Sequence, residues 1–587
     1  MHHRITAVLI ALLLGTLSCE RSQQPPKNQA AVSSVPKAGV STAGAYLRRK
    51  FGNRAWNLNV YPEALDCLGV DFIDEHYCRV STGGTYQENR TNTLSQINDY
   101  IRFAQTRGSD FLWNLEISNF RERIEYRPGK NFFESEPGLH YFKMPEEWLR
   151  ELSKTKRFIG VTYDELEHMQ LSSNRFMRRD CNGDVPALVD TTGMSLEQAY
   201  DAIVDKAVKL RDYYGQYGAL CNVEMVWPVM HHIFARAGWT LSPKLLKESW
   251  NPAVIAMALG AAIEYQAKGA NLWFSPDLWF RANYPGHSVN ELRSALLAAH
   301  WVGADRVYVE NFDHVYTRRG GPHHPDAEGQ FGSLVGFEDA NSFTVTSYGR
   351  VFQWYARQYK DKHPRPYTWR HARCKIAIVR FPDSSWGGRG GEFRDRLLGA
   401  KDQPSTPTTE AWFEIWHLLS LGTIPNTGLS FNSHHTANLG PTFFCPMPEV
   451  LVFDHRIADQ IPDFDFRGAE VIFLTGITVT DSTLALIEKR VKEGVTCIAL
   501  PHLVPEHIER IFPRAASKPV FVDSGKGRWI VTEDFAAKHV ANAVREYLPK
   551  ENEMRYIFGS RSLILKRDGS NDRTKVLLDG VEILPES

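Results

Sequence analysis

The sequence has no excess of charge of either sign. Its 587 residues carry 68 Lys and Arg against 68 Asp and Glu, which gives a formal net charge of +0 at pH 7. A protein that binds nucleic acid needs a basic face to neutralise the phosphates. The composition therefore argues against nucleic acid as a partner.

Motifs for metals and nucleotides are also missing. The 8 cysteines form no Cys-x-x-Cys, and an odd number of them follows Cys19. This argues against a zinc cage or a dense disulfide framework. Cys221 and Cys497 lie inside apolar runs, so we expect them in the core. Neither a Gly-x-Gly-x-x-Gly motif nor a Walker loop occurs, and we expect no cofactor and no metal.

The apolar run at the N-terminus, residues 5–14, is too short for an ordinary membrane span. Basic residues precede it and small residues follow it, as in a secretory signal. Cys19 comes directly after Leu17 and Ser18, which resembles the lipobox of bacterial lipoproteins, although Leu17 sits one place nearer the cysteine than usual. The resemblance implies a lipid on Cys19 and an exported protein held at the cell envelope; simple signal cleavage is the alternative. Residues 20–42 then read as a flexible tether.

Residues 43–366 repeat one theme, a short apolar strand followed by a helix. Eight such units predict a (β/α)8 barrel rather than an open sheet. Two of the helices are expected to begin at capping boxes, at Ser195 and at Ser288. The predicted strands cover residues 55–61, 70–77, 110–117, 157–164, 219–227, 270–275, 305–309 and 332–337.

Carboxylates follow several of these predicted strands. Glu165 ends the fourth and Glu310 the seventh, at the strand ends where barrel enzymes carry their chemistry. Glycoside cleavage needs one protonated and one ionised carboxyl, so we predict that these two are partners. The alternative is that each only pairs with a nearby Arg. Asp164 can raise the pKa of Glu165 by like-charge repulsion, or it can point to the opposite face of the strand.

Other residues at the strand ends are candidates for binding a sugar. Aromatic residues make up 12% of the chain, with 15 Trp, and such rings are common sugar platforms, although large cores also use them. About half of the four tryptophans at or just past strand ends, Trp113, Trp227, Trp273 and Trp279, are expected to be core. The substrate-binding candidates are Asp164, Glu116, Trp113, Glu224, Trp227, Trp273, Asn311 and His76.

Residues 367–587 show a different pattern of predicted strands and helices. Apolar strands near residues 375–381, 450–453, 469–474 and 495–500, with helices near 410–421 and 482–492, predict a doubly wound α/β domain. The tail from about residue 520 completes this domain and adds a small β element. Without a nucleotide motif, we expect a structural role or assembly of a homo-oligomer.

Catalytic glutamates after strands four and seven resemble clan A glycoside hydrolases, and the order of the two parts resembles the family 42 β-galactosidases. The resemblance implies that Glu165 is the acid/base and Glu310 the nucleophile of a glycosidase acting on an oligo- or polysaccharide. One departure is Asp164, where the clan usually has an Asn that contacts the sugar 2-hydroxyl. Two alternatives stay open: an inactive carbohydrate-binding lipoprotein, and a barrel lyase or deacetylase, which would predict metal ligands.

Overall fold

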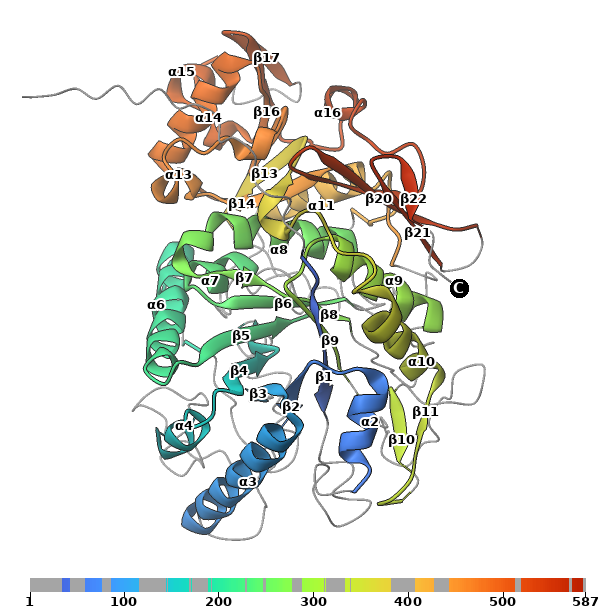
Figure 1. The fold of residues 1–587 in the computed structure, drawn as a ribbon. Helices are drawn as coiled ribbons and strands as arrows, with labels where there is room; N and C mark the ends of the chain where they lie inside the picture. The colour runs from blue at the N-terminus through green and yellow to red at the C-terminus, as the bar shows by residue number, and fades with distance from the viewer. Residues whose placement is uncertain are drawn as a thin grey trace, which may run out of the picture.

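The computed structural model describes residues 34–42, 59–76, 86–115, 144, 146–167, 170, 188–189, 191, 193–226, 230–245, 250–276, 288–310, 312, 333–337, 339–381, 407–426, 443–511, 519–569 and 573–583. A (β/α)8 barrel occupies the lower half of Figure 1, and the C-terminal α/β domain lies above it. Both parts belong to the α/β class, as the sequence predicts.

Eight strand positions form the barrel wall, and all of the pairs between them are parallel. In chain order they are β1 (Lys37–Thr42), β2 (Phe72–His76), β3 (Asp110–Asn114), β4 (Phe158–Asp164), β5 (Leu220–Met225), β6 (Thr240–Leu245), the two short pieces β7 (Asn271–Leu272) and β8 (Ser275–Pro276), and β9 (Arg306–Val309).

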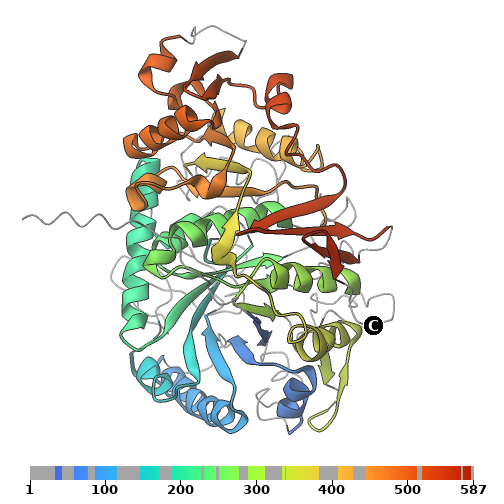
Figure 2. The same ribbon diagram turned by 45° about the horizontal axis from the view of Figure 1, so that its top comes forward.

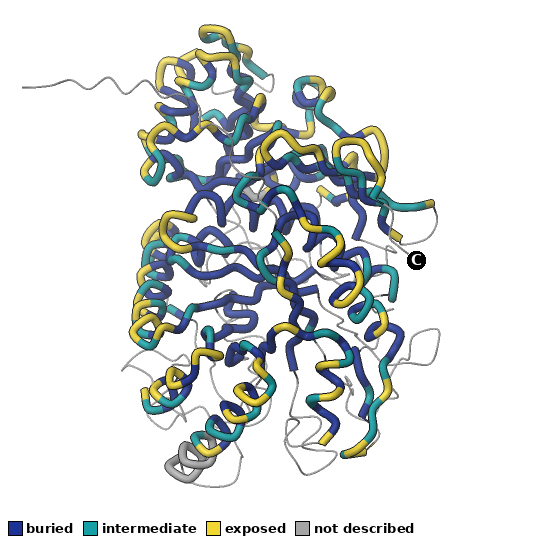
Figure 3. The backbone as a smooth tube through the Cα atoms, in the orientation of Figure 1, coloured by how far each residue is buried: buried dark blue, intermediate teal, exposed yellow. Residues whose placement is uncertain are grey.

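The sheet closes between the seventh and eighth positions. β7 and β8 both pair with β6, so they are two pieces of one strand. Phe274, between them, bridges to Val307 of β9, while β9 pairs with β1 along Lys37–Val40. Buried on both faces, such strands are rich in apolar residues, and Figure 3 draws most of this wall as buried.

A helix follows each strand position and covers the outside of the barrel. The local signals for α6 and α9 are both present: Gln198 N–H donates to Ser195 Oγ at 3.2 Å and Glu291 N–H donates to Ser288 Oγ at 3.1 Å. The capping boxes are therefore confirmed. The helices are α2 (Tyr61–Leu68), α3 (Tyr86–Arg107), α4 (Glu146–Leu152), α6 (Leu196–Gly215), α7 (His231–Arg236), α8 (Asn251–Glu264), α9 (Val289–Trp301) and α10 (Ser347–Trp354).

The strand count predicted from the sequence is wrong at both ends and in the middle. The first strand is β1, in the segment expected to be tether, whereas residues 59–60 form a turn and Tyr61 begins α2. The sixth strand is β6, which the sequence analysis missed. The segment 332–337 contains β10 (Val335–Phe337), which among the described strands pairs with β11 (Phe343–Val345) and not with the wall. The strand that precedes Glu310 is therefore the eighth of the barrel, not the seventh.

The C-terminal domain contains a six-stranded sheet in the order β14-β13-β15-β16-β18-β17. The first five are parallel and β17 is an antiparallel edge. Numbered within this domain, the order begins 2-1-3-4, which is the flavodoxin-like form of a doubly wound fold. The strands are β13 (Ile376–Arg380), β14 (Val450–Asp454), β15 (Val471–Thr475), β16 (Thr496–Ala499), β17 (Val520–Ser524) and β18 (Gly527–Val531).

Among the described residues, five α-helices accompany this sheet, and the chain also forms a smaller antiparallel sheet. The helices are α11 (Pro407–Leu419), α13 (Ile457–Gln460), α14 (Asp481–Glu493), α15 (Glu506–Glu509) and α16 (Lys538–Val544). The small sheet has the order β12 (Ala372–Arg373), β19 (Glu553–Phe558), β20 (Arg561–Arg567), β21 (Thr574–Leu578) and β22 (Val581–Ile583).

Helix α8 lies between the barrel wall and β14 of the C-terminal sheet (Figure 2). Every one of its residues is buried, which fits a helix that is packed on all sides rather than on one face. Gly260 allows this contact, because a Cβ there would overlap the Val452 carbonyl. The barrel and the C-terminal sheet therefore share one continuous core.

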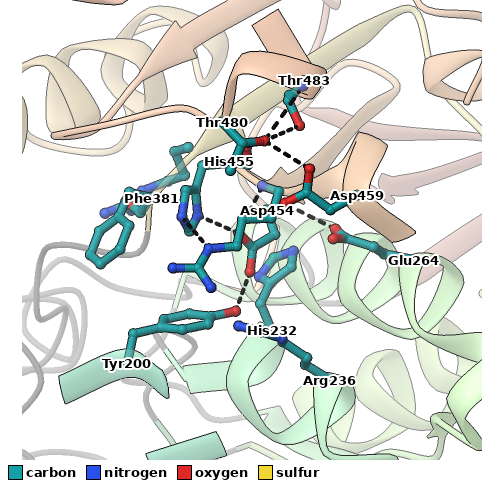
Figure 4. A network of polar contacts seen from close by, with 12 residues as sticks. Tyr200, His232, Arg236, Glu264, Phe381, Asp454, His455, Asp459, Thr480 and Thr483 are labelled. Carbon is teal, nitrogen blue, oxygen red and sulfur yellow. Dashed lines mark hydrogen bonds and ion pairs between the residues drawn. The ribbon is translucent and has the colours of Figure 1, made fainter. Parts of the chain in front are cut away.

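A buried polar network ties the two parts together beside this helix (Figure 4). Asp454, at the end of β14, pairs with His455 and accepts hydrogen bonds from the Tyr200 and Tyr265 hydroxyls of the barrel helices. Burial raises the pKa of Asp454, but His455 outweighs it and holds the pKa below its usual range. Its central groups, Asp454 and His455, are buried between packed elements of the two parts.

Candidate active site

The inside of the barrel is built in layers, because alternate residues of each strand point inward. The lowest layer is apolar and comprises Phe72, Leu112, Trp273 and Tyr308. Above it, Asn222 Nδ2 donates to the Tyr308 hydroxyl at 3.2 Å, and Ser242 Oγ donates to Asn222 Oδ1 at 2.7 Å. Two residues further along the chain, the next inward positions are Glu224 on β5, Lys244 on β6 and Glu310 just after β9.

Lys244 is the centre of that upper layer. Its Nζ lies 2.7 Å from Glu310 Oε2 and 3.2 Å from Asp164 Oδ1. It lies 3.4 Å from Glu165 Oε1 and 3.7 Å from Glu224 Oε1. Four carboxyls from the ends of β4, β5 and β9 thus converge on one ammonium from β6, at the C-terminal end of the barrel where this fold carries its chemistry.

Asp164 and Glu165 both reach Lys244, although neighbours on a regular strand point to opposite faces. The reason is the backbone of Glu165, which leaves the extended form with a φ of 50°. Its N–H donates to the Glu224 carbonyl at 2.7 Å, which fixes the turn. A left-handed conformation is costly for a residue with a Cβ, and backbone strain of this kind clusters at functional sites. The alternative that Asp164 points to the opposite face of the strand is therefore wrong.

The four carboxyls differ in their access to solvent. The side chains of Asp164 and Glu224 are 0% exposed, whereas those of Glu165 and Glu310 are 5% and 12% exposed. A group that reacts with a substrate must touch it. Glu165 and Glu310 are therefore the two carboxyls of this cluster that a bound molecule could reach, whereas Asp164 and Glu224 are fully covered.

The two fully buried carboxyls, Asp164 and Glu224, differ from Lys244 in the charge that their shifted pKa values favour. Burial, with the nearby carboxylates, raises the pKa of Asp164 well above its usual range despite Lys244. The same causes raise the pKa of Glu224 to about 7. Burial alone would lower the pKa of Lys244, but the four carboxylates outweigh it and raise this pKa well above its usual value. The lysine is therefore a cation, and the inner carboxyls are shifted toward their neutral forms.

A cationic lysine restricts what this site can do. A Schiff-base enzyme needs a neutral amine to attack a carbonyl carbon, and the carboxylates around Lys244 hold it in the other form. A pair of carboxyls at the barrel mouth fits acid–base and nucleophilic work at one substrate bond. Among the residues that the structure describes, no cluster of His, Cys, Asp and Glu is arranged to hold a metal ion.

Two of the predicted sugar platforms are core residues. Trp113 is 1% exposed and makes an edge contact with Tyr100 of α3, at 5.7 Å between ring centroids. Trp273 is 2% exposed in the lowest layer, with the Arg306 guanidinium over its ring at 5.1 Å. Both rings are covered by packing, which argues against their prediction as substrate-binding residues. Cys221 and Cys497 are buried, as predicted.

Several predicted residues cannot be placed. The side chain of His76, at the end of β2, is outside the described part of the structure. The same holds for the whole residues Cys19, Glu116, Trp227 and Asn311. In the part of the chain that is described, no helix has the length and apolar character needed to cross a membrane.

The sequence analysis missed Lys244 and Asp74. Asp74 lies on β2, where it accepts from Asn114 Nδ2 at 2.8 Å and from Ser41 Oγ at 3.2 Å. It is close enough to contribute to the raised pKa of Glu224. A signal for Lys244 was present, since residues 239–242 alternate between apolar and polar as in a strand, but Pro243 argues against a strand.

No family model and no curated protein matches the sequence. Solved structures of similar arrangement include an exo-β-1,4-mannosidase from Opitutaceae bacterium strain TAV5, at 13% identity over 89% of this chain and 99% of that one, with a TM-score of 0.49. A GH5_18 protein from Streptomyces cattleya in complex with GlcNAc has 15% identity over 76% and 99%, with a TM-score of 0.42. The catalytic module of a family 98 glycoside hydrolase from Streptococcus pneumoniae has 10% identity over 93% and 76%, with a TM-score of 0.42. At these values the comparisons carry no argument about activity.

Proposed function

We propose that this chain is a retaining glycoside hydrolase in which Glu165 is the acid/base and Glu310 the nucleophile. The observation that carries the proposal is the convergence of these two carboxyls on Lys244. They follow the fourth and eighth strand positions, so they come from opposite sides of the barrel mouth. Two carboxyls so placed can flank one glycosidic bond.

The spacing of the pair supports retention of configuration. Glu165 Oε1 and Glu310 Oε2 lie 3.4 Å and 2.7 Å from the same nitrogen, so their separation cannot exceed these two lengths laid end to end. That limit applies to these two oxygens, and it is compatible with the roughly 5–5.5 Å between the carboxyl groups of a retaining enzyme.

The proposal does not depend on the clan A strand pattern. That pattern places the nucleophile after the seventh strand, and Glu310 follows the eighth. Asp277 is the residue that follows β8 in the sequence, and it lies outside the described residues. The resemblance to family 42 enzymes stays a prediction, and the test of the site must separate Glu310 from Asp277.

The experiment that tests the function is hydrolysis of a panel of aryl β- and α-glycosides, followed by proton NMR of the anomer that forms first. We expect at least one sugar to be released with its configuration retained. Release with inverted configuration would overturn the retaining mechanism. If every sugar is bound and none is cleaved, the chain is a carbohydrate-binding protein rather than an enzyme.

A further inference from the structure

Lys244 connects the two carboxyls to which the proposed function assigns the chemistry. β6 lies two strand positions from β4 and two from β9, so its ammonium reaches both sides of the barrel mouth. The contact with Glu310 Oε2 is 2.7 Å and that with Glu165 Oε1 is 3.4 Å. The lysine is itself 2% exposed and sits below the more exposed ends of the two glutamates.

Glu165 and Glu310, the two carboxyls proposed to react, share the positive charge of Lys244. Four acidic groups lie around its ammonium: Asp164 and Glu165 from the end of β4, Glu224 from β5 and Glu310 after β9. The neighbouring β8 contributes the neutral Ser275, which pairs with Lys244 in register. The raised pKa values of Asp164 and Glu224 shift these two toward neutral forms. Much of the ammonium's field is then available to Glu165 and Glu310, in surroundings where charges are weakly screened.

The retaining reaction moves one negative charge from one of these carboxyls to the other. In the first step the Glu310 carboxylate forms a bond to the anomeric carbon as the glycosidic bond breaks, and the proton of Glu165 passes to the leaving oxygen. Glu310 is then a neutral ester and Glu165 a carboxylate. In the second step water gives its proton to Glu165 and its oxygen to the anomeric carbon, which returns Glu310 to a carboxylate.

We propose that Lys244 is a positioning residue that holds both carboxyls and neutralises whichever of them is charged as the reaction proceeds. The proposal rests on the proposed function. The ammonium needs no large movement between the two steps, because it already contacts both glutamates. A preorganised charge of this kind costs no reorganisation at the moment of reaction.

The test is the pH dependence of kcat/KM for Lys244→Met, measured on the best substrate of the panel. Without the cation, both glutamates should hold their protons more tightly. The acidic limb of the pH profile, set by Glu310, and the basic limb, set by Glu165, should therefore both move to higher pH by about one unit or more. Lys244→Arg, which keeps the charge, should leave both limbs near their wild-type positions while lowering kcat.

Lys360→Met is the matched control. Lys360 is also buried and pairs with Asp71 at 3.3 Å, but it lies at the end of the helical segment that follows α10, away from the cluster. This variant should lose stability and keep the wild-type pH profile. If Lys244→Met does not fold, Lys244→Gln is neutral, can hydrogen bond to the same carboxyls and serves the same test.

Unchanged limbs in the neutral variants of Lys244 would overturn the role of the lysine. That result is distinguishable from failure of the proposed function. If no glycoside of the panel is cleaved, or if Glu165→Ala and Glu310→Ala keep wild-type turnover, the proposed function or its assignment of residues is wrong. If only the inference about Lys244 is wrong, those two variants are impaired while the pH limbs of Lys244→Met stay in place.

Discussion

Lys244 Nζ lies 2.7 Å from Glu310 Oε2, although the two residues belong to strand positions that are not neighbours in the barrel. The contact forms across the interior, in the layer above Asn222 and Tyr308. It fixes Glu310 relative to Glu165, which the same ammonium contacts at 3.4 Å. The geometry of the proposed chemistry therefore depends on a residue that does none of the bond making.

Replacing Glu310 with Ala should remove the nucleophile. Turnover of every cleavable glycoside should fall by about 10³-fold or more, because no group remains to form the covalent intermediate. Azide should enter the vacated space and restore cleavage, giving a glycosyl azide of inverted configuration. The measurement is steady-state rate with and without azide, with NMR of the product. Glu197→Ala, on the exposed face of α6, is a control that should leave the rate unchanged.

Replacing Glu165 with Ala should depend on the leaving group. A general acid contributes about 10²–10⁴-fold when the leaving oxygen needs a proton, so natural glycans should stall. Aryl glycosides with good leaving groups need little protonation, and their first step should survive. Azide should then give a product of retained configuration, because it attacks the glycosyl-enzyme without a base. Equal losses on both classes of substrate would contradict the role of Glu165.

The raised pKa of Glu224 predicts a pH-dependent stability. Its value of about 7 in the folded protein is above the ordinary 4.5, so the folded state keeps a proton that the unfolded chain releases. The stability that this proton contributes is present at low pH and is lost as the pH rises from about 4.5 to about 7. Glu224→Gln removes the titration. Between these pH values the free energy of unfolding of Glu224→Gln, minus that of wild type, should increase by up to about 1.4 kcal/mol for each pH unit.

Urea unfolding over this pH range checks the prediction, with Glu197→Gln as an exposed control. The difference between Glu224→Gln and wild type should rise with pH and level off above about 7. A difference that stays constant across the range would mean that Glu224 is ionised throughout.

The lipobox-like Cys19 predicts membrane anchoring. In a bacterial host, the wild-type protein should partition with the membrane fraction, and Cys19→Ser should release it or block its maturation. Cell fractionation with a soluble periplasmic marker is the measurement. Recovery of the wild-type protein entirely with that marker would rule out a lipid anchor.

The elements with strong local signals were predictable from the sequence. Capping boxes located the starts of α6 and α9, and apolar runs located β4, β5 and the parallel strands of the C-terminal domain. β1 was hidden because Lys37–Thr42 carries little apolar signal and is stabilised by its pairing with β2 and β9. β6 was hidden because Pro243 interrupts it and only the six-residue α7 separates it from β5.

The site was predictable only in part, for a related reason. Glu165 and Glu310 could be read from the ends of apolar runs, and the structure brings both to Lys244. Their common partner depends on which residues share a layer of the barrel, which follows from strand register and not from local sequence. The burial of Trp113 and Trp273 also depends on neighbours distant in the chain. The position and contacts of these side chains are therefore set by tertiary packing, which local sequence does not reveal.

The central claim is that Glu310 is the nucleophile, and covalent trapping tests it most directly. A panel of 2-deoxy-2-fluoro glycosides with good leaving groups should inactivate the protein, because the fluorine slows breakdown of the glycosyl-enzyme. Mass spectrometry of the digested protein should place one fluorosugar on the peptide that contains Glu310, with fragmentation assigning the ester to this residue. Glu310→Ala should take up no label. A fluorosugar esterified to Asp277, Glu165 or Glu224 would contradict the assignment of Glu310.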